Sequence, residues 1–142
     1  MLVDANLLLY AVDEASTLHE AARQWLEDAL NGARRVGLPW PSLTAFMRIA
    51  TNPRAMADPL NAHEAWGHVE EWLDAPAAWV PQPSHGHRAI LGELITGLDL
   101  RANLVPDAVL AALCLEHGLT IYSADSDFAR FPRLRWVNPL LG

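Results

Sequence analysis

An alternation of short apolar segments with longer segments of helical periodicity restricts the fold of this chain more than any other feature. The apolar segments are predicted strands, and they lie at residues 2–3, 36–38, 78–80, 119–122 and 134–137. Strands that alternate with helices form a mostly parallel sheet, and the helices cover both of its faces. The sequence therefore predicts an α/β fold with a central, mostly parallel sheet of four to five strands.

The helical segments are recognised by the spacing of their apolar residues and by signals at their ends. Thr17 with Glu20, and Asn61 with Glu64, have the spacing of a capping box, and an amphipathic stripe follows each pair. Gly118 is expected to end the last helix, because glycine is favoured directly after a helix. Further helices are predicted at residues 43–50, 85–96 and 106–117.

The size of the chain and its single cysteine narrow the class of protein. A length of 142 residues is close to the common size of one domain, so we expect a single domain over residues 1–142. Cys114 is the only cysteine, which excludes an intrachain disulfide and fits the reducing cytoplasm. No segment reaches the roughly 18 consecutive apolar residues of a membrane span. We therefore expect a soluble, cytoplasmic protein that does not enter a membrane.

The charge of the chain limits how it could meet a nucleic acid. The formal net charge is −7, which argues against nucleic-acid binding through a broad basic face. All ten basic residues are arginine. Any contact with phosphate would therefore use the planar guanidinium group, which suits bidentate recognition.

Aspartates stand where strands end and where the last long helix begins. Asp4 follows the first predicted strand, Asp107 lies in the first turn of the last long helix, and Asp125 and Asp127 follow the fourth strand. These positions share one edge of a parallel sheet, where gathered carboxylates repel one another unless a cation neutralises them. Oxygen ligands alone favour Mg²⁺ or Mn²⁺. Each of these residues also has a structural alternative. An acid such as Asp107 is favoured at a helix start by the helix dipole, and one of Asp125 and Asp127 could simply form a turn.

The histidines and tryptophans give weaker indications of function. His85 and His87 could form half of a transition-metal site, but two ligands without a third are more often ordinary polar residues. Trp72 lies on an apolar stripe and is expected in the core. Trp40 and Trp66 are candidates for a surface that contacts a partner.

Four segments together resemble the PIN-domain ribonucleases, and among them the VapC toxins of bacterial toxin-antitoxin pairs. These are VDAN at residues 3–6, NLVPDA at 103–108, EHG at 116–118 and SADSDF at 123–128. The resemblance covers essentially the whole chain. It implies a PIN-like three-layer sandwich and an endoribonuclease that depends on Mg²⁺ or Mn²⁺, cuts RNA and is inhibited by a VapB-type antitoxin.

The resemblance also assigns roles to residues. Asp4, Asp107 and Asp125 match the acidic, metal-binding positions of the family, and Asn6 and Ser123 match neighbouring polar positions. Asp127 is a possible outer ligand. The family commonly has a glutamate in the helix after the second strand, but Ala45 stands there in this chain. This departure affects the second metal position, where Ser42 or Thr44 would contribute through water.

The sequence also suggests residues that contact RNA, protein partners and alternative functions. Arg48 and Arg54 are candidates for contacts with the RNA backbone. Weaker candidates for the same role are Arg34, Arg35, Arg130, Arg133 and Arg135. The family implies a homodimer, and an antitoxin that adds a helix or strand to a groove and presents an arginine to the carboxylates. Two alternatives remain: a PIN-fold nuclease that acts on other nucleic acid, and a non-catalytic binding module with a decayed site. An aspartyl phosphatase ranks last, because the segment Asp4-Ala5-Asn6 has no second aspartate at its third position.

Overall fold

A five-stranded parallel sheet lies at the centre of the structure, a computed structural model that describes residues 1–141. The strand order is β3-β2-β1-β4-β5, and every neighbouring pair is parallel. Leu2 of the central strand is paired with Gly37 on one side and with Ile121 on the other. The strands are β1 (Leu2–Val3), β2 (Val36–Gly37), β3 (Ala78–Trp79), β4 (Ile121–Tyr122) and β5 (Trp136–Val137). All five predicted strands are confirmed.

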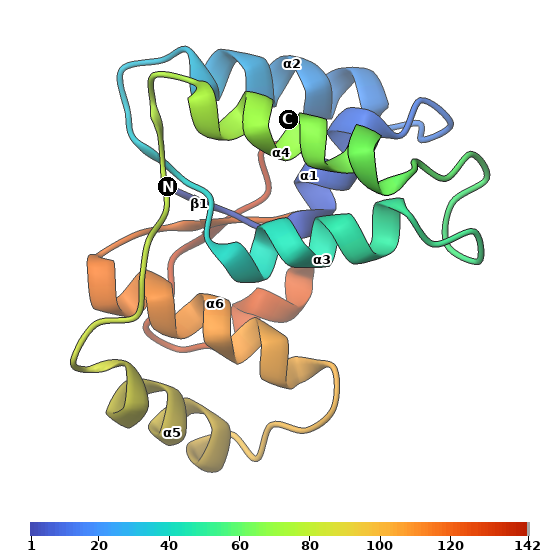
Figure 1. Cartoon of the computed structure of the whole chain (residues 1–142). Helices are drawn as coiled ribbons and strands as arrows, with labels where there is room; N and C mark the ends of the chain where they lie inside the picture. The colour runs from blue at the N-terminus through green and yellow to red at the C-terminus, as the bar shows by residue number, and fades with distance from the viewer. Residues whose placement is uncertain (142) are drawn as a thin grey trace.

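In the described part of the chain, six α-helices cover the two faces of this sheet and give the predicted three-layer architecture (Figure 1). Helices α1 to α4 share one hydrophobic core with the sheet, and α5 and α6 share the other. A short 3₁₀ helix, η1 (Ser126–Arg130), follows β4. The helices are α1 (Ala5–Val12), α2 (His19–Leu30), α3 (Trp40–Ala50), α4 (Ala62–Asp74), α5 (His87–Gly97) and α6 (Leu104–His117). Within residues 1–141, none of them is long and apolar enough to cross a membrane.

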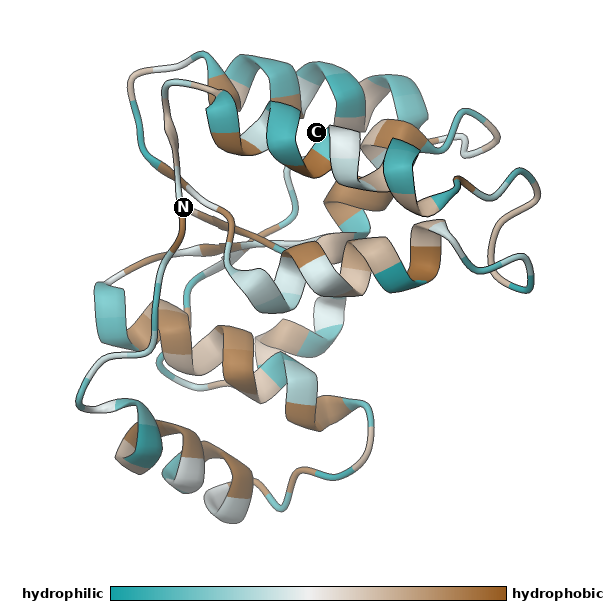
Figure 2. Cartoon of the chain, in the orientation of Figure 1, coloured by the Kyte–Doolittle hydropathy of each residue, from teal (hydrophilic) through white to brown (hydrophobic). Residues whose placement is uncertain are grey.

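The two cores receive alternate residues of the same strands, because successive side chains of a strand point to opposite faces. Val3 packs in the core of α1 to α4, whereas Leu2 packs in the core of α5 and α6. Helix α6 lies between the sheet and α5, and it is rich in apolar residues, whereas the outer surface of α2 is mostly hydrophilic (Figure 2). Trp72 of α4 is buried against Phe46 of α3, with ring centroids 4.8 Å apart, as expected for a core tryptophan.

One of the two predicted capping boxes is confirmed and the other is wrong. The side chain of Asn61 accepts a hydrogen bond from the Glu64 N–H, and the Glu64 carboxylate accepts one from the Asn61 N–H. The helix predicted from Thr17 instead begins at His19 and has no side-chain cap. The carboxylate of Glu20 binds Arg23 at 2.5 Å, one turn further along the helix, and is therefore not used as a cap.

Helix α1 was not predicted from the sequence, although it follows the central strand directly. Its residues, ANLLLYAV, are apolar on nearly all sides, so they show little helical periodicity. Asp4 caps the helix, because its Oδ1 accepts a hydrogen bond from the Ala5 N–H at 2.8 Å. At the other end of the chain Gly118 ends α6 in the left-handed conformation with φ 66°, as predicted.

Candidate active site

The candidate active site lies at the edge of the sheet where β1 and β4 end. These two strands are neighbours, and the Asp4 N–H donates a hydrogen bond to the Tyr122 carbonyl at 3.0 Å. Ser123 follows β4 directly, so it lies beside Asp4. Helix α6 returns the chain to the start of β4 and therefore begins at this same edge, with Asp107 in its first turn. The topology thus brings together residues that are more than 100 positions apart in the sequence.

Asp4 is held by a small hydrogen-bond network. The Ser123 hydroxyl donates to Oδ2 of Asp4 at 2.7 Å, and the Asn6 side-chain amide donates to the same hydroxyl oxygen at 3.1 Å. The Asp125 N–H also donates to Ser123 Oγ, at 3.0 Å. Burial raises the pKa of Asp4, and the hydrogen bonds from Ser123 and Ala5 offset part of this rise. Asn6 and Ser123 therefore fix the position of Asp4, as neighbouring polar groups.

Three other carboxylates form a compact group at this edge. One oxygen each from Asp107, Asp125 and Asp127 lies within 4.8 Å of the other two. Burial raises the pKa of Asp107 to about 6, and the negative charges of Asp4, Asp125 and Asp127 contribute to the rise. Mutual repulsion of this kind is relieved when the group binds a cation. The carboxylates are all hard oxygen donors, which fit Mg²⁺ or Mn²⁺ better than zinc.

The members of this group differ in one respect from the expected set of ligands. Asp4 acts electrostatically on Asp107 but is not part of the group within 4.8 Å, whereas Asp127 is. Asp125 also caps η1, because its Oδ1 accepts a hydrogen bond from the Asp127 N–H at 2.8 Å. A turn was expected as an alternative to metal binding for one of these two aspartates. In the structure the turn forms, and both Asp125 and Asp127 still lie at the site.

Arg130 was one of the weaker candidates for RNA contact in the sequence, and the structure brings it to this site. Its Nη2 lies 3.2 Å from Oδ1 of Asp127, and its Nε donates to the Asp127 carbonyl at 3.0 Å. The signal in the sequence was the spacing of three between Asp127 and Arg130, which brings the two side chains together within one turn of a 3₁₀ helix.

Helix α3 holds the residues expected near a second metal position. The Ser42 hydroxyl is buried and has no hydrogen-bond partner within residues 1–141. Ser42 lies in the first turn of α3, which begins just beyond the carboxyl end of β2 and so on the same edge as Asp4. Thr44 is exposed and donates to the Trp40 carbonyl at 2.8 Å, so its hydroxyl is used within the helix. Ala45 is half-buried, and α3 contains no acidic residue.

Arg48 and Arg54 were the expected contacts to an RNA backbone. Both side chains are exposed, Arg48 on α3 and Arg54 in the loop after it. Neither forms an ion pair within the part of the chain that the structure describes. Their role in binding RNA stays a prediction.

A second polar cluster lies away from the site and has a structural role. The Glu116 side chain is fully buried, and it accepts hydrogen bonds from the Ser84 N–H and hydroxyl, each at 2.7 Å. His87 Nδ1 binds its other oxygen at 2.5 Å. Burial would raise the pKa of Glu116, but the hydrogen bonds from His87 and Ser84 outweigh it, so the pKa lies below its ordinary value. His87 thus connects α5 to α6 through Glu116.

Glu116→Ala is expected to lower the free energy of unfolding by about 1–3 kcal/mol at pH 7, because it removes the acceptor of two hydrogen bonds from Ser84 and one from His87. The lowered pKa means that the ionised carboxylate stabilises the fold above pH 4.5 and that this contribution is lost as the pH falls through the folded pKa. Urea unfolding at pH 7 measures the change. Glu93→Ala is the control, because Glu93 is exposed on α5. An equal effect of the two substitutions would refute the role of Glu116.

Comparison with known proteins agrees with this geometry. The family model of the PIN domain matches residues 1–134, which is nearly the whole chain. The parallel sheet, its helical layers and the acidic edge therefore define a PIN-domain protein. Two curated relatives are more specific. Ribonuclease VapC37 of Mycobacterium tuberculosis is 46% identical over 138 residues, covering 97% of this chain and 96% of the relative.

Ribonuclease VapC33 of the same species is 41% identical over 137 residues, covering 96% of each chain. Identity at this level over the full length shows the family. The chain belongs to the VapC ribonucleases, the PIN-domain toxins of VapBC toxin-antitoxin systems.

Solved structures share the fold at much lower sequence identity. VapBC2 from Rickettsia felis, solved with a DNA fragment of its promoter, matches with a TM-score of 0.72 at 16% identity and covers 96% of both chains. VapC20 from M. tuberculosis, a toxin that cleaves the sarcin-ricin loop, matches with a TM-score of 0.68 at 17% identity and covers 94% of this chain and 98% of that one. These likenesses establish the architecture.

Proposed function

We propose that this toxin is an endoribonuclease that hydrolyses RNA phosphodiester bonds with the help of Mg²⁺ or Mn²⁺, and that it acts as a single domain. The observation that carries the proposal is the group of Asp107, Asp125 and Asp127, whose oxygens lie within 4.8 Å of one another at the carboxyl edge of the sheet. An oxygen-only donor set of this kind fits a hard divalent cation.

The carboxylates have different roles in this proposal. Asp107, Asp125 and Asp127 would hold the ion directly, and Asp4 adds negative charge from a position fixed by Ser123. A bound ion of this kind lowers the pKa of water and neutralises charge on a phosphoryl group. Since α3 contributes no carboxylate, we propose one tightly held ion, with the buried hydroxyl of Ser42 contributing through water to a second position.

The net charge of −7 is compatible with an RNA substrate in this arrangement. Much of the acidity at the sheet edge is neutralised when a cation binds, and one divalent ion changes the formal total from −7 to −5. The local potential then favours an approaching phosphate. A reducing cytoplasm suits the single cysteine, because Cys114 is buried and burial raises the pKa of its thiol to about 12.

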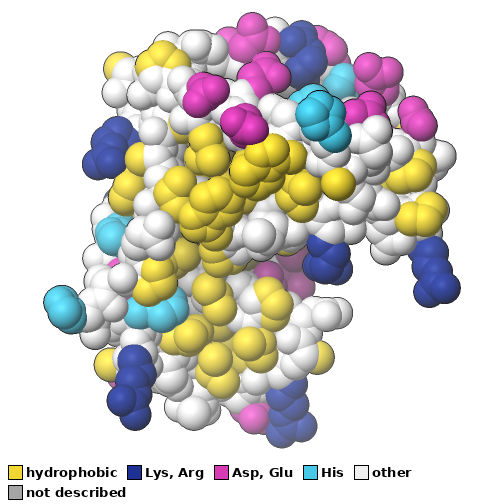
Figure 3. Space-filling view, viewed as in Figure 1, with side chains coloured by type: hydrophobic (Ala, Val, Ile, Leu, Met, Phe, Trp, Pro, Cys, Tyr) yellow, Lys and Arg dark blue, Asp and Glu magenta, His cyan; other side chains and the backbone are white. Residues whose placement is uncertain are grey.

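An exposed aromatic pair supports the proposed homodimer. Trp40 and Trp66 stack with ring centroids 6.2 Å apart and planes 6° from parallel, yet both remain about 40% exposed. Hydrophobic side chains gather on the face of the molecule that carries α3 and α4 (Figure 3). Large exposed aromatic residues are enriched at protein interfaces. We place the contact between two copies of the chain on this face.

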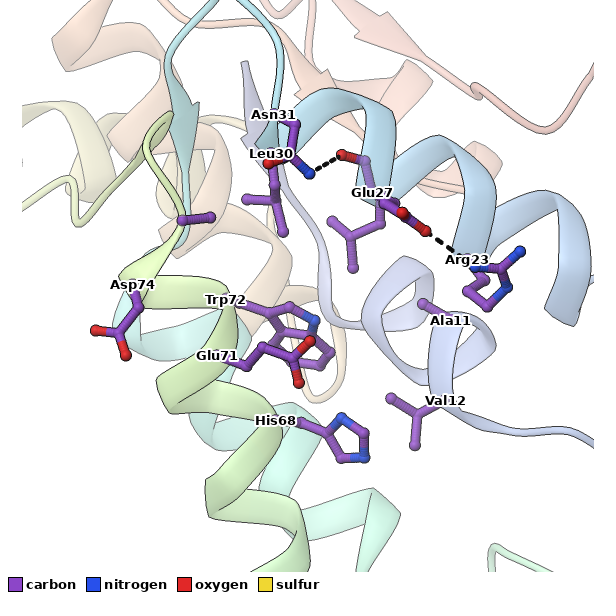
Figure 4. A pocket seen from close by; sticks show the side chains of 12 residues that line it. Ala11, Val12, Arg23, Glu27, Leu30, Asn31, His68, Glu71, Trp72 and Asp74 are labelled. Carbon is purple, nitrogen blue, oxygen red and sulfur yellow. Dashed lines mark hydrogen bonds and ion pairs between the residues drawn. The ribbon is translucent and has the colours of Figure 1, made fainter.

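A pocket between α2 and α4 is the proposed groove for the antitoxin (Figure 4). Its volume is about 570 Å³, and apolar residues that include Leu26, Leu30 and Trp72 line it. The acidic side chains of Glu27, Glu71 and Asp74 lie around these apolar residues, and Arg23, which also lines the pocket, pairs with Glu27 at 2.9 Å. This combination suits an amphipathic segment that carries basic residues beside its apolar face. An arginine of the same antitoxin could reach the carboxylates of the active site and compete with the cation.

Cleavage of RNA and DNA of matched sequence tests the proposed function. We expect cleavage of single-stranded RNA with Mg²⁺, none with excess EDTA, and none of the matched DNA. Below a pKa of about 6 Asp107 is protonated and binds cations poorly, so at limiting Mg²⁺ the rate at pH 5 should be about tenfold lower than at pH 7. Equal cleavage of DNA would favour a nuclease for other nucleic acids. The absence of metal-dependent cleavage would favour a decayed site.

A further inference from the structure

We propose that Arg130 binds the RNA backbone beside the acidic group. The inference rests on the proposed function and names a substrate-binding residue of that same site. It replaces Arg48 and Arg54 as the first candidate for this role. Arg130 has defined contacts with the site, whereas Arg48 and Arg54 have no side-chain hydrogen bond or ion pair to it among the residues that the structure describes.

The contacts with Asp127 fix the guanidinium of Arg130 at the rim of the site. Nε donates to the Asp127 carbonyl at 3.0 Å, and Nη2 lies 3.2 Å from Oδ1 of the same residue. Two nitrogens of one planar group are therefore anchored on a single residue. That residue belongs to the carboxylate group, so the guanidinium is held next to the position of the proposed cation.

The same geometry leaves donors for a substrate. A guanidinium has five N–H donors. Asp127 accepts hydrogen bonds from two of them, the N–H of Nε and one N–H of Nη2. Nη1 has no hydrogen-bond partner within residues 1–141. The Nη1 and Nη2 edge therefore remains available, and it has the spacing that matches two oxygens of a phosphate. The Arg130 side chain is 37% exposed, so a strand of RNA can reach it.

The charge distribution around the site also favours binding of a phosphate by Arg130. Asp107 is surrounded by the negative charges of Asp4, Asp125 and Asp127, and Arg130 is the positive group that opposes them. A phosphodiester that approaches this edge meets strong repulsion from the acids. The ion neutralises part of that charge, and the guanidinium adds a fixed positive charge directly beside it.

Binding of RNA to variants in an inactive Asp107→Asn background tests the inference, since the RNA then stays intact. The probe is a fluorescently labelled, single-stranded RNA of mixed sequence, and its anisotropy gives the affinity in EDTA at several salt concentrations, because this background is not expected to hold the cation. Adding Arg130→Gln is expected to weaken binding about five- to tenfold in low salt and to reduce the slope of log Kd against log salt by about 0.7, the value for one phosphate contact on a single strand.

Two further variants separate a specific contact from general charge. Arg130→Lys keeps the charge but loses the planar fork, so the slope should be retained while affinity falls by less than in Arg130→Gln. Arg133→Gln removes the same charge from an exposed residue just beyond η1 and should change affinity by less than about twofold. Thermal unfolding of each variant checks that the fold is intact.

The outcomes are distinguishable from a failure of the proposed function. If wild-type protein cleaves RNA with Mg²⁺ but Arg130→Gln binds the probe as tightly as its parent, the role of Arg130 is refuted. Equal weakening by Arg130→Gln and Arg133→Gln would also refute it, because the effect would then be one of net charge. If wild-type protein does not cleave RNA at all, the proposed function itself fails.

Discussion

Asp107→Asn is expected to reduce RNA cleavage by roughly 10²–10³-fold while making the metal-free protein more stable at pH 7.5. The loss of activity follows from the removal of a charged ligand from the group of three carboxylates. The gain in stability follows from the pKa of Asp107, which burial and neighbouring acids raise to about 6. A carboxyl group with a raised pKa favours folding below its unfolded pKa, and this contribution is lost as the pH rises through the folded pKa.

The expected size of the stabilisation is modest. A rise from 3.8 to about 6 corresponds to about 3 kcal/mol at full value, and solvent screening at this partly exposed residue reduces the figure to about 1 kcal/mol. The unfolding temperature should then rise by about 2–4 °C. Thermal unfolding in EDTA at pH 7.5 measures this change, and the difference should vanish at pH 4.

A matched substitution controls for the change in net charge. Asp99→Asn removes the same charge from an exposed loop residue that, within residues 1–141, pairs only with Arg101. Asp99 has φ 50°, a left-handed conformation that asparagine also adopts readily, so the backbone should not be strained. We expect wild-type cleavage and a change in unfolding temperature below about 1 °C. Undiminished cleavage by Asp107→Asn would contradict the role of Asp107.

Asp4→Asn and Asp4→Ala are expected to separate the electrostatic role of this residue from its structural role. Both should reduce cleavage by roughly 10²-fold or more, because both remove the negative charge that faces Asp107. Asparagine can still accept the hydrogen bond from the Ala5 N–H, since asparagine and aspartate cap helices about equally well. Alanine loses this cap and leaves the Ser123 hydroxyl without its acceptor, which should cost about 1–3 kcal/mol.

Urea unfolding and RNA cleavage, measured on the same preparations, check this pair of variants. The expected pattern is two inactive proteins of which only Asp4→Ala is clearly destabilised. Wild-type cleavage by Asp4→Asn would show that the charge of Asp4 is not needed. Strong destabilisation of both variants would show that the buried carboxylate itself stabilises the fold.

The sequence predicted the strands and most helices because their patterns are local. The capping box of Asn61 and Glu64 is such a pattern, and so is the apolar run before Asp4. Helix α1 was missed because its residues are apolar on nearly all sides and show no clear stripe. The box at Thr17 was predicted wrongly because the same glutamate at position 20 can pair with Arg23 instead, and spacing alone does not decide between these two partners.

The sequence could predict only the part of the candidate site that follows from the order of strands and helices. Parallel strands bring Asp4 and Asp125 to one edge, and a crossover helix brings Asp107 to the same edge. The inclusion of Asp127 depends on the cap that Asp125 forms on η1, which spacing does not reveal. Arg130 was only one of several weaker candidates among the ten arginines, because the sequence does not show its ion pair with Asp127 beside the carboxylates.

The central claim is that the acidic edge of the sheet is a cation site. Calorimetric titration of the metal-free protein with Mg²⁺ at pH 7.5 tests it most directly. The account predicts one saturable binding event in the wild-type protein, its loss in Asp107→Asn and its retention in Asp99→Asn. Equal binding by wild type and Asp107→Asn, or no binding by wild type, would contradict it.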